Sequence, residues 1–169
     1  MHMRLVHAPM PTGSIWEILE RALLAEPHIL GSRITATKLR ELYDEGLAVV
    51  GFYEERLVGF IAAWPVSADH VEVGSAWIHI EHRGVGFGTQ LVAKMADLLR
   101  EQKKSGFAIS DNPAFIATTR KVHLPLHNEW KSPIPYELTC GPCEKFPNDE
   151  MKDACPYRNN ACRLILFNS

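Results

Sequence analysis

The feature that most constrains this chain is a run of alternating glycines, R-G-V-G-F-G at residues 83–88, between an apolar segment and a helix-like one. Because glycine has no side chain, the backbone N–H groups of such a loop can approach a ligand closely. A helix that follows presents its unpaired N–H groups and the positive end of its dipole at the same place. Arg83 adds a fork of donors that suits phosphate oxygens. The loop is therefore predicted to cradle a pyrophosphate.

Two other phosphate-binding loops fit this sequence less well. A P-loop ends in Gly-Lys-Ser/Thr, whereas Gly88 is followed by Thr89 and Gln90 with no lysine. A dinucleotide-binding loop needs G-x-G-x-x-G tight against a strand, with an acidic residue about twenty positions further on. The last glycine spacing does not fit, and a hairpin precedes the loop where a parallel βαβ unit would not have one. Asp111, after the next short strand, keeps this alternative open.

Hydrophobic periodicity predicts the elements on both sides of the loop. Helical spacing of apolar residues predicts four helices, over residues 15–23, 35–45, 86–102 and 112–122. Apolar runs predict five strands, over residues 47–53, 56–64, 71–80, 107–110 and 163–167. The first three strands follow one another as an antiparallel meander, with Glu54 and Glu55 at the first turn. The expected fold is α+β, with a mixed, mostly antiparallel sheet flanked by helices and a loop-rich, cysteine-containing C-terminal extension.

Strand, loop and helix together resemble the GNAT superfamily of acyl-CoA-dependent N-acyltransferases. The signature of that family, Q/R-x-x-G-x-G/A, lies between its fourth strand and third helix, and Arg83, Gly86 and Gly88 occupy it here. The resemblance extends upstream to V-E-V-G-S-A-W-I-H-I-E-H-R and to R-L-V-G-F in the hairpin, and it covers roughly residues 35–124. We therefore expect a GNAT-like domain over residues 1–135. Residues 136–169 would form a cysteine-rich extension packed on the same domain.

The resemblance implies an N-acetyltransferase that moves an acetyl group from acetyl-CoA to a primary amine by direct attack. The backbone of Ile78, His79 and Ile80 would pair with the pantetheine arm of acetyl-CoA, as an added strand would. Asn112 would contact the same arm. The pyrophosphate would be held by the loop and by the first residues of the helix after it: Arg83, Gly84, Val85, Gly86, Phe87, Gly88 and Thr89.

Catalytic roles follow the same resemblance. Glu72 aligns with the acidic residue that the family often uses as a general base, directly or through water; the alternative is a strand-edge glutamate that faces solvent. Thr119 stands where the family usually has the tyrosine that protonates the departing thiolate, and His123 stands where glycine is usual. Tyr136, His123 and His127 are the candidates for a different acid. If none of them serves, either the thiolate leaves unaided or activity is lost.

Aromatic and histidine side chains near these segments have two interpretations each. Trp64, Trp77 and Trp130 can line an acceptor pocket, but large aromatic residues more often belong to a core. His79 and His82 flank the loop. We expect them beside the cofactor or in solvent rather than on a metal, since no other ligand types cluster there in the sequence.

All four cysteines fall in one segment with the spacing C-x2-C-x11-C-x6-C: Cys140, Cys143, Cys155 and Cys162. In a cytoplasmic chain this concentration favours metal, most simply a structural zinc on four thiolates, and an iron–sulfur cluster would use the same ligands. C-G-P-C also matches the thioredoxin redox motif, but the 26 residues after Cys143 are too few to supply that fold. Disulfides or unpaired thiols would also be consistent with this spacing.

Charge and hydropathy exclude several partners. A net charge of −2 and a pI near 6.4 give no long-range attraction for nucleic acid or an anionic membrane. The longest apolar stretch, residues 57–66, is about half the length that spans a bilayer. Without an export signal, the cytoplasm is the expected location. The sequence does not identify the oligomeric state; the resemblance leaves a homodimer open, because pairing through exposed strands is common in the family. The alternative function is a non-catalytic module that binds acyl-CoA or a partner protein. The sequence does not identify the acceptor amine.

Overall fold

The computed structural model describes residues 2–6, 14–29, 31–127, 133–139 and 162–167. Its strands form one seven-stranded sheet in the order β1-β2-β3-β4-β5-β7-β6. They are β1 (Arg4–Val6), β2 (Ala48–Tyr53), β3 (Arg56–Pro65), β4 (His70–Ile78), β5 (Ser105–Ser110), β6 (Leu126–His127) and β7 (Arg163–Leu166). Among these, only β4 and β5 pair in parallel. The predicted mixed, mostly antiparallel sheet is confirmed.

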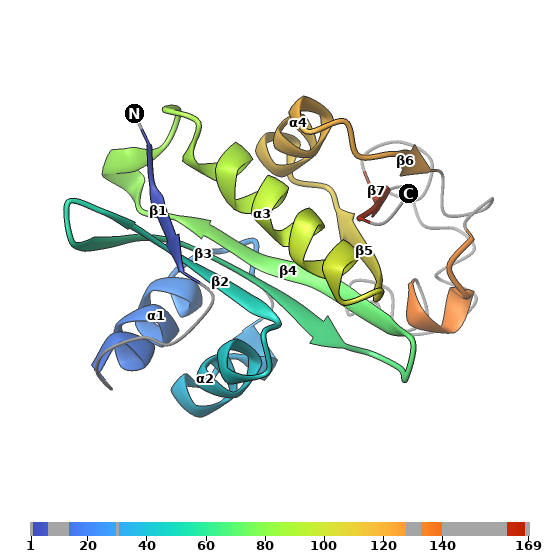
Figure 1. Ribbon diagram of the computed structural model, residues 1–169, viewed down its shortest axis with the longest axis horizontal. Coiled ribbons are helices and arrows are strands. Elements are labelled where there is room, and N and C mark those ends of the chain that lie inside the picture. Colours follow the sequence, from blue (N-terminus) through green and yellow to red (C-terminus); the bar gives the residue numbers. More distant parts are fainter. Residues whose placement is uncertain (1, 7–13, 30, 128–132, 140–161, 168–169) are drawn as a thin grey trace.

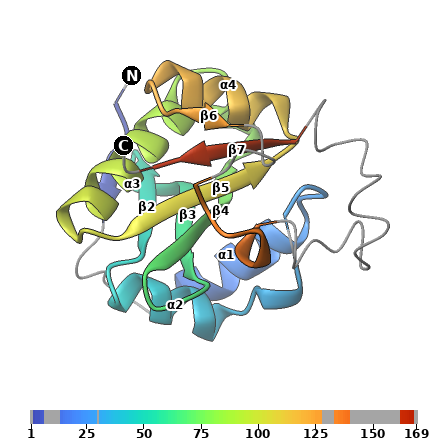
Figure 2. The same cartoon turned by 90° about the vertical axis from the view of Figure 1, so that its right-hand side faces the viewer.

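Two layers of helices cover this sheet (Figures 1 and 2). The helices are α1 (Ser14–Leu24), α2 (Ala36–Asp44), α3 (Phe87–Glu101) and α4 (Pro113–Lys121). α1 and α2 lie on one face, and α3 and α4 lie on the other. All four predicted helices are present within one or two residues of their expected ends. None of the described helices has the length and apolar character needed to cross a membrane.

α3 packs close to the sheet because its inward stripe meets a small residue on β3. Five residues of the stripe are buried: Leu91, Val92, Met95, Leu98 and Leu99. A Cβ atom at Gly59 would lie 2.9 Å from Leu91 Cδ1, so a larger residue there would force the Leu91 side chain to move. The packing fixes where the N-terminus of α3 sits relative to β4.

The turn of the β2–β3 hairpin has the geometry expected of a two-residue connection but not its usual residues. Glu54 and Glu55 both have positive φ, 48° and 61°, between the paired Tyr53 and Arg56. Turns of this hand match the twist of the two strands, which is why Asn-Gly is commonest there. Two glutamates occupy the left-handed region instead, where they carry a conformational strain.

β4 differs from its prediction at its end and in its middle. It stops at Ile78 rather than Ile80, because Ile80–His82 form a short 3-10 helix, η2, capped by His79. Its register with β3 shifts between Phe60 and Ala62, and Ser75 has a φ of 53°. Such a β-bulge reverses which residues of the strand face each side of the sheet.

β4 and β5 pair only at their beginnings. Residues 70–72 of β4 pair with residues 105–107 of β5, and β5 continues by pairing with β7 on its other side. Residues 73–78 of β4 therefore have no strand partner on that side among the described residues; we call this the open edge of β4. Backbone groups at such an edge can pair with an amide-rich ligand.

Candidate active site

A cleft of about 310 Å³ lies where the open edge of β4 meets the N-termini of α3 and α4. Four elements contribute to it: the connection after α1, β4, the glycine loop with α3, and α4. Its lining includes Glu26, His28, Ala76, Trp77, Ile78, Arg83, Gly84, Gly86, Gly88, Thr89, Asn112, Ala114 and Thr118. The cleft thus brings together the loop, the strand end and Asn112, which the sequence predicts to bind one ligand.

The N-terminus of α3 is open toward this cleft. Gly86 caps the helix with a φ of 92° and without any side-chain hydrogen bond. The first hydrogen bond of the helix runs from Gln90 N to Gly86 O at 3.2 Å, so the N–H groups of residues 87–89 precede the helical ladder. Gly84 also has positive φ, 78°, and a Cβ at either glycine would meet nothing within 4 Å. Uncapped N–H groups beside clear space fit an anionic ligand group.

Phe87 and Val85 are not among the described residues that line the cleft, so only their backbones would take part in the predicted cradle. The Phe87 side chain is buried and packs on His82, with ring centroids 6.0 Å apart and planes 13° apart, and on Tyr53 at 5.4 Å. Val85 is exposed. The pKa of Tyr53 is raised first by the negative charge of Glu54, then by burial and by a hydrogen bond to Glu54. Its phenol therefore stays protonated under this loop at neutral pH.

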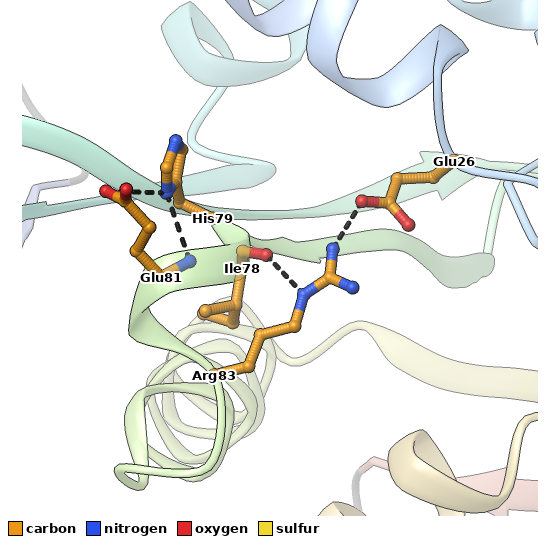
Figure 3. A network of polar contacts seen from close by, with 5 residues as sticks. All are labelled: Glu26, Ile78, His79, Glu81 and Arg83. Atoms are coloured by element: carbon orange, nitrogen blue, oxygen red, sulfur yellow. Dashed lines mark hydrogen bonds and ion pairs between the residues drawn. The ribbon is translucent and has the colours of Figure 1, made fainter.

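Arg83 is held by two partners at the edge of the cleft (Figure 3). Its Nε donates to Ile78 O at 2.9 Å, and its Nη2 forms an ion pair with Glu26. The N–H of His79 donates to Val58 O on β3 at 2.8 Å, so the Ile78 carbonyl in the same peptide points the other way, toward the open edge. Arg83 thus joins the connection after α1 to the end of β4, and its role on a pyrophosphate stays a prediction.

Glu72 lies at the fork where β4 and β5 part, on the sheet face that α1 and α2 cover. Its Oε2 accepts a hydrogen bond from Arg33 Nη1 at 2.8 Å, and the two side chains are 23% and 26% exposed. The Arg33 guanidinium lies over the Trp64 ring, 4.5 Å from its centroid. Glu72 is not among the described residues that line the cleft. Its predicted role as a general base stays a prediction.

Comparison with known proteins decides the family. The model of the acetyltransferase (GNAT) family matches residues 14–122, more than half of the chain. The chain belongs to this family. A comparison with curated proteins finds no match.

Solved structures share this GNAT fold at low sequence identity. yncA from Salmonella typhimurium, solved with acetyl-CoA, is 20% identical over 75% of this chain and 81% of its own, with a TM-score of 0.59. A phosphinothricin acetyltransferase from Sinorhizobium meliloti, also with acetyl-CoA, is 19% identical over 75% and 77%, with a TM-score of 0.60. N-acetylglutamate synthase from Neisseria gonorrhoeae, with coenzyme A and N-acetyl-glutamate, is 17% identical over 100% and 36%, with a TM-score of 0.62. These likenesses show the fold.

Asn112 has a structural role in the GNAT domain that the sequence alone did not assign. Its Oδ1 caps α4 by accepting from Ala114 N at 2.9 Å and from Phe115 N at 3.3 Å. Pro113 follows at the first helical position, where a missing N–H costs nothing. Asn112 still lines the cleft, so contact with the cofactor arm stays a prediction.

Thr119, at the position of the usual GNAT tyrosine, is fully buried. Its Oγ1 donates to Ile116 O at 2.9 Å, which keeps the hydroxyl inside its own helix. His123 has a φ of 60° and ends α4, since Leu124 N bonds Thr119 O across it at 3.1 Å. Glycine would adopt this left-handed position without the steric cost that His123 carries.

The other candidate acids are not part of the described lining of the GNAT cleft. Tyr136 begins the short 3-10 helix η4 (Tyr136–Leu138), and His127 lies in β6. Neither these two nor His123 is among the described residues that line the cleft. Their roles stay predictions.

The histidines beside the loop lie close to an acidic side chain, contrary to the prediction from the sequence. Glu81 joins His79 and His82, and one ligand atom from each of the three lies within 4.8 Å of the others. The statement that no other ligand type clusters there is therefore wrong. His79 Nδ1 accepts from Glu81 N at 3.4 Å and lies 3.9 Å from its Oε2, as Figure 3 shows.

Most of the predicted zinc site falls outside the described residues. Cys140, Cys143 and Cys155 lie there, as does Trp130. Cys162 is half-buried immediately before β7. The zinc site, and the division of the chain at residue 135, stay predictions. Trp64 and Trp77 are 4% and 7% exposed, which fits a role in the core, although Trp77 also lines the cleft.

Proposed function

We propose that this GNAT protein transfers an acetyl group from acetyl-CoA to a primary amine. The observation that carries the proposal is the uncapped N-terminus of α3, whose glycines open onto the cleft beside the open edge of β4. Anion-binding N–H groups and unpartnered strand backbone are what a pyrophosphate followed by an amide-rich arm requires. Two similar structures that hold acetyl-CoA support the same ligand.

The glycine loop, the open edge of β4 and Glu72 have separate roles in this reaction. Residues 83–89 hold the pyrophosphate, and the open edge of β4 aligns the pantetheine arm. Acetyl-CoA supplies the thioester whose carbonyl carbon the amine attacks; a C–N bond forms, the C–S bond breaks and coenzyme A leaves as its thiolate. Glu72 takes the proton of the amine, directly or through water. Since Thr119 is buried and bonded within α4, the thiolate leaves without help from that position.

The buried Thr119 also favours a second candidate, a module that binds acyl-CoA without catalysis. Such a protein would keep the loop and the cleft but lack an efficient proton path to the thiolate. Release of coenzyme A thiol on a broad panel of amines separates the two functions. Cytoplasmic location stays a prediction from the sequence, and a homodimer stays open.

Heat stability with and without acetyl-CoA tests the ligand first. At a hundred times its dissociation constant, a ligand that binds only the folded state adds about 2.7 kcal/mol. We expect this shift for the wild type and for Arg40→Glu, which changes an exposed arginine of α2. Arg83→Glu should abolish it, because a carboxylate in the loop repels phosphate. No shift with acetyl-CoA, together with a shift from a nicotinamide dinucleotide, would reject the proposal.

A further inference from the structure

The turn between β4 and the glycine loop brings three metal-binding side chains together. His79, Glu81 and His82 each place one ligand atom within 4.8 Å of the other two. The turn is the 3-10 helix η2, with His79 as its cap, and residues three apart lie above one another on such a turn. The rings of His79 and His82 accordingly lie on the same side, with centroids 5.7 Å apart. Local backbone geometry therefore gathers the three ligands.

Aromatic packing holds both imidazole rings in place. His82 stacks on Phe87, with ring planes 13° apart, and its centroid lies 5.7 Å from that of Tyr53. His79 meets Trp77 edge-on, with centroids 6.0 Å apart. In metal sites, neighbouring groups that fix the ring orientation of a ligating histidine raise its affinity. The two rings thus need little ordering when an ion binds.

Glu81 completes the set of ligands. Its side chain is 69% exposed, and its Oε2 lies 3.9 Å from His79 Nδ1. Ligand atoms around a tetrahedral zinc ion lie about 3.3–3.5 Å apart, since each bond is about 2.0–2.2 Å long. An exposed glutamate can close this gap by a change of rotamer. The hydrogen bond from Glu81 N to His79 Nδ1 is long, at 3.4 Å, so an ion can displace it at little cost.

The arginine that follows these ligands does not compete with a cation for them. Arg83 donates to Ile78 O and pairs with Glu26, and Figure 3 shows its side chain extending toward Glu26 and away from Glu81. Within the part of the chain that the structure describes, no lysine or arginine forms an ion pair with Glu81. The Glu81 carboxylate can therefore supply negative charge to a bound ion.

The ligand types select the kind of ion. Two imidazole nitrogens and one carboxylate oxygen suit Zn²⁺, Co²⁺, Ni²⁺ and Cu²⁺, whereas Mg²⁺ and Ca²⁺ prefer oxygen ligands. We infer that this turn binds one divalent transition-metal ion, such as zinc, through His79, Glu81 and His82, with water in the remaining position. The ion cross-links the turn that leads into the glycine loop. This inference goes beyond the proposed acetyl transfer and does not depend on it.

Zinc binding to the full chain, measured by equilibrium dialysis without acetyl-CoA, tests the site. We expect a dissociation constant of about 1 µM, weaker than that of a closed four-ligand site because one position is left to water. Glu81→Gln and His79→Asn should each weaken binding by at least about 10- to 100-fold. Asparagine at residue 79 still offers an acceptor that can cap η2, so the turn is kept. His70→Gln, a change elsewhere on β4, is the control and should bind zinc as the wild type does.

Cobalt separates this site from the zinc site predicted on the cysteines. Co²⁺ bound by nitrogen and oxygen shows visible d–d bands, and Co²⁺ bound by thiolates adds intense charge-transfer bands in the near ultraviolet. We expect d–d bands that Glu81→Gln and His79→Asn remove while any thiolate bands remain. The same number of bound ions and the same affinities in wild type and both variants would overturn the inference. So would binding of Mg²⁺ or Ca²⁺ as tight as that of Zn²⁺. Heat stability of the metal-free variants shows that they are folded.

Discussion

The N-termini of α3 and α4 face the same cleft, but only one of them has a side chain that caps its first N–H groups. α4 is closed by its own sequence, because Asn112 Oδ1 accepts from two of its first N–H groups. α3 begins at Gly86 with no side-chain cap at all. A helix end that satisfies its own donors gains stability, and one that leaves them unpaired gains the capacity to bind an anion. Of these two adjacent termini, that of α3 is therefore the one suited to bind an anionic ligand.

Closing the terminus of α3 should have the largest effect. Gly86→Val places a β-branched residue at a φ of 92°, so the loop must rearrange and its N–H groups no longer converge. We expect affinity for acetyl-CoA to fall by about 100-fold or more, equivalent to two charge-assisted hydrogen bonds. Titration of acetyl-CoA against heat stability measures this. Gly46→Val, at a φ of 72° in the turn after α2 and outside the cleft lining, is the control; its Cβ would in addition lie 3.0 Å from Gln102 Nε2. It should lose a similar stability of about 1–2 kcal/mol and keep its affinity.

Removing the cap of α4 should act on stability before affinity. Asn112→Ala is expected to lower the free energy of unfolding by about 1 kcal/mol, as Thr35→Ala should by uncapping α2. Because Asn112 also lines the cleft, Asn112→Ala should weaken acetyl-CoA binding by about 3-fold, whereas Thr35→Ala should leave it unchanged. Urea titration and ligand titration give the two numbers. If Asn112→Ala lost as much affinity for acetyl-CoA as Gly86→Val, the two helix N-termini would not differ in their contribution to ligand binding.

Glu26 competes with an anionic ligand for Arg83. Removing the charge of Glu26 should therefore raise the affinity for that ligand at the N-terminus of α3. Glu26→Gln releases the guanidinium and should strengthen acetyl-CoA binding by about 2- to 5-fold, the worth of a partly exposed ion pair. Glu55→Gln removes an exposed pair with Arg4 and should change nothing. If Glu26→Gln weakened binding, Glu26 would instead hold Arg83 in the geometry that binds phosphate.

The smallest effect is expected at the buried Thr119 of α4. Thr119→Val removes a hydroxyl that bonds only within the helix, so thiol release during turnover should change by no more than about 2-fold. Stability should fall by about 0.5–1.5 kcal/mol, the value of one buried hydrogen bond. A folded Thr119→Val protein without turnover would show that this hydroxyl serves as the acid after all.

Local patterns were enough to predict most of the elements. α3 and α4 begin and end where their glycine, asparagine and lysine signals indicated, and the meander followed from three apolar runs. β1 and β6 were missed because three and two residues carry no measurable period. The end of β4 was placed two residues late because Ile80 continues the apolar alternation, while the η2 turn depends on His79 capping Glu81.

The site was predicted less completely because its partners are distant in the sequence. The family signature identified the loop, the strand end and Asn112, and the structure brings them to one cleft. Glu26 and Arg33 carry no local signal. They are 57 and 39 residues from Arg83 and Glu72, and only the fold sets them side by side.

The place of β7 in the sheet has a consequence for how the chain is made. Residues 163–166 lie between β5 and β6, paired with residues 107–110 on one side and 126–127 on the other (Figure 2). During synthesis, the ribosome exposes β5 well before the segment that covers it. Until β7 emerges, the buried side chains of Phe107 and Ala108 lie next to an unpaired strand edge, which is a template for wrong pairing. Nascent chains stalled before residue 163 should therefore be the ones that need a chaperone.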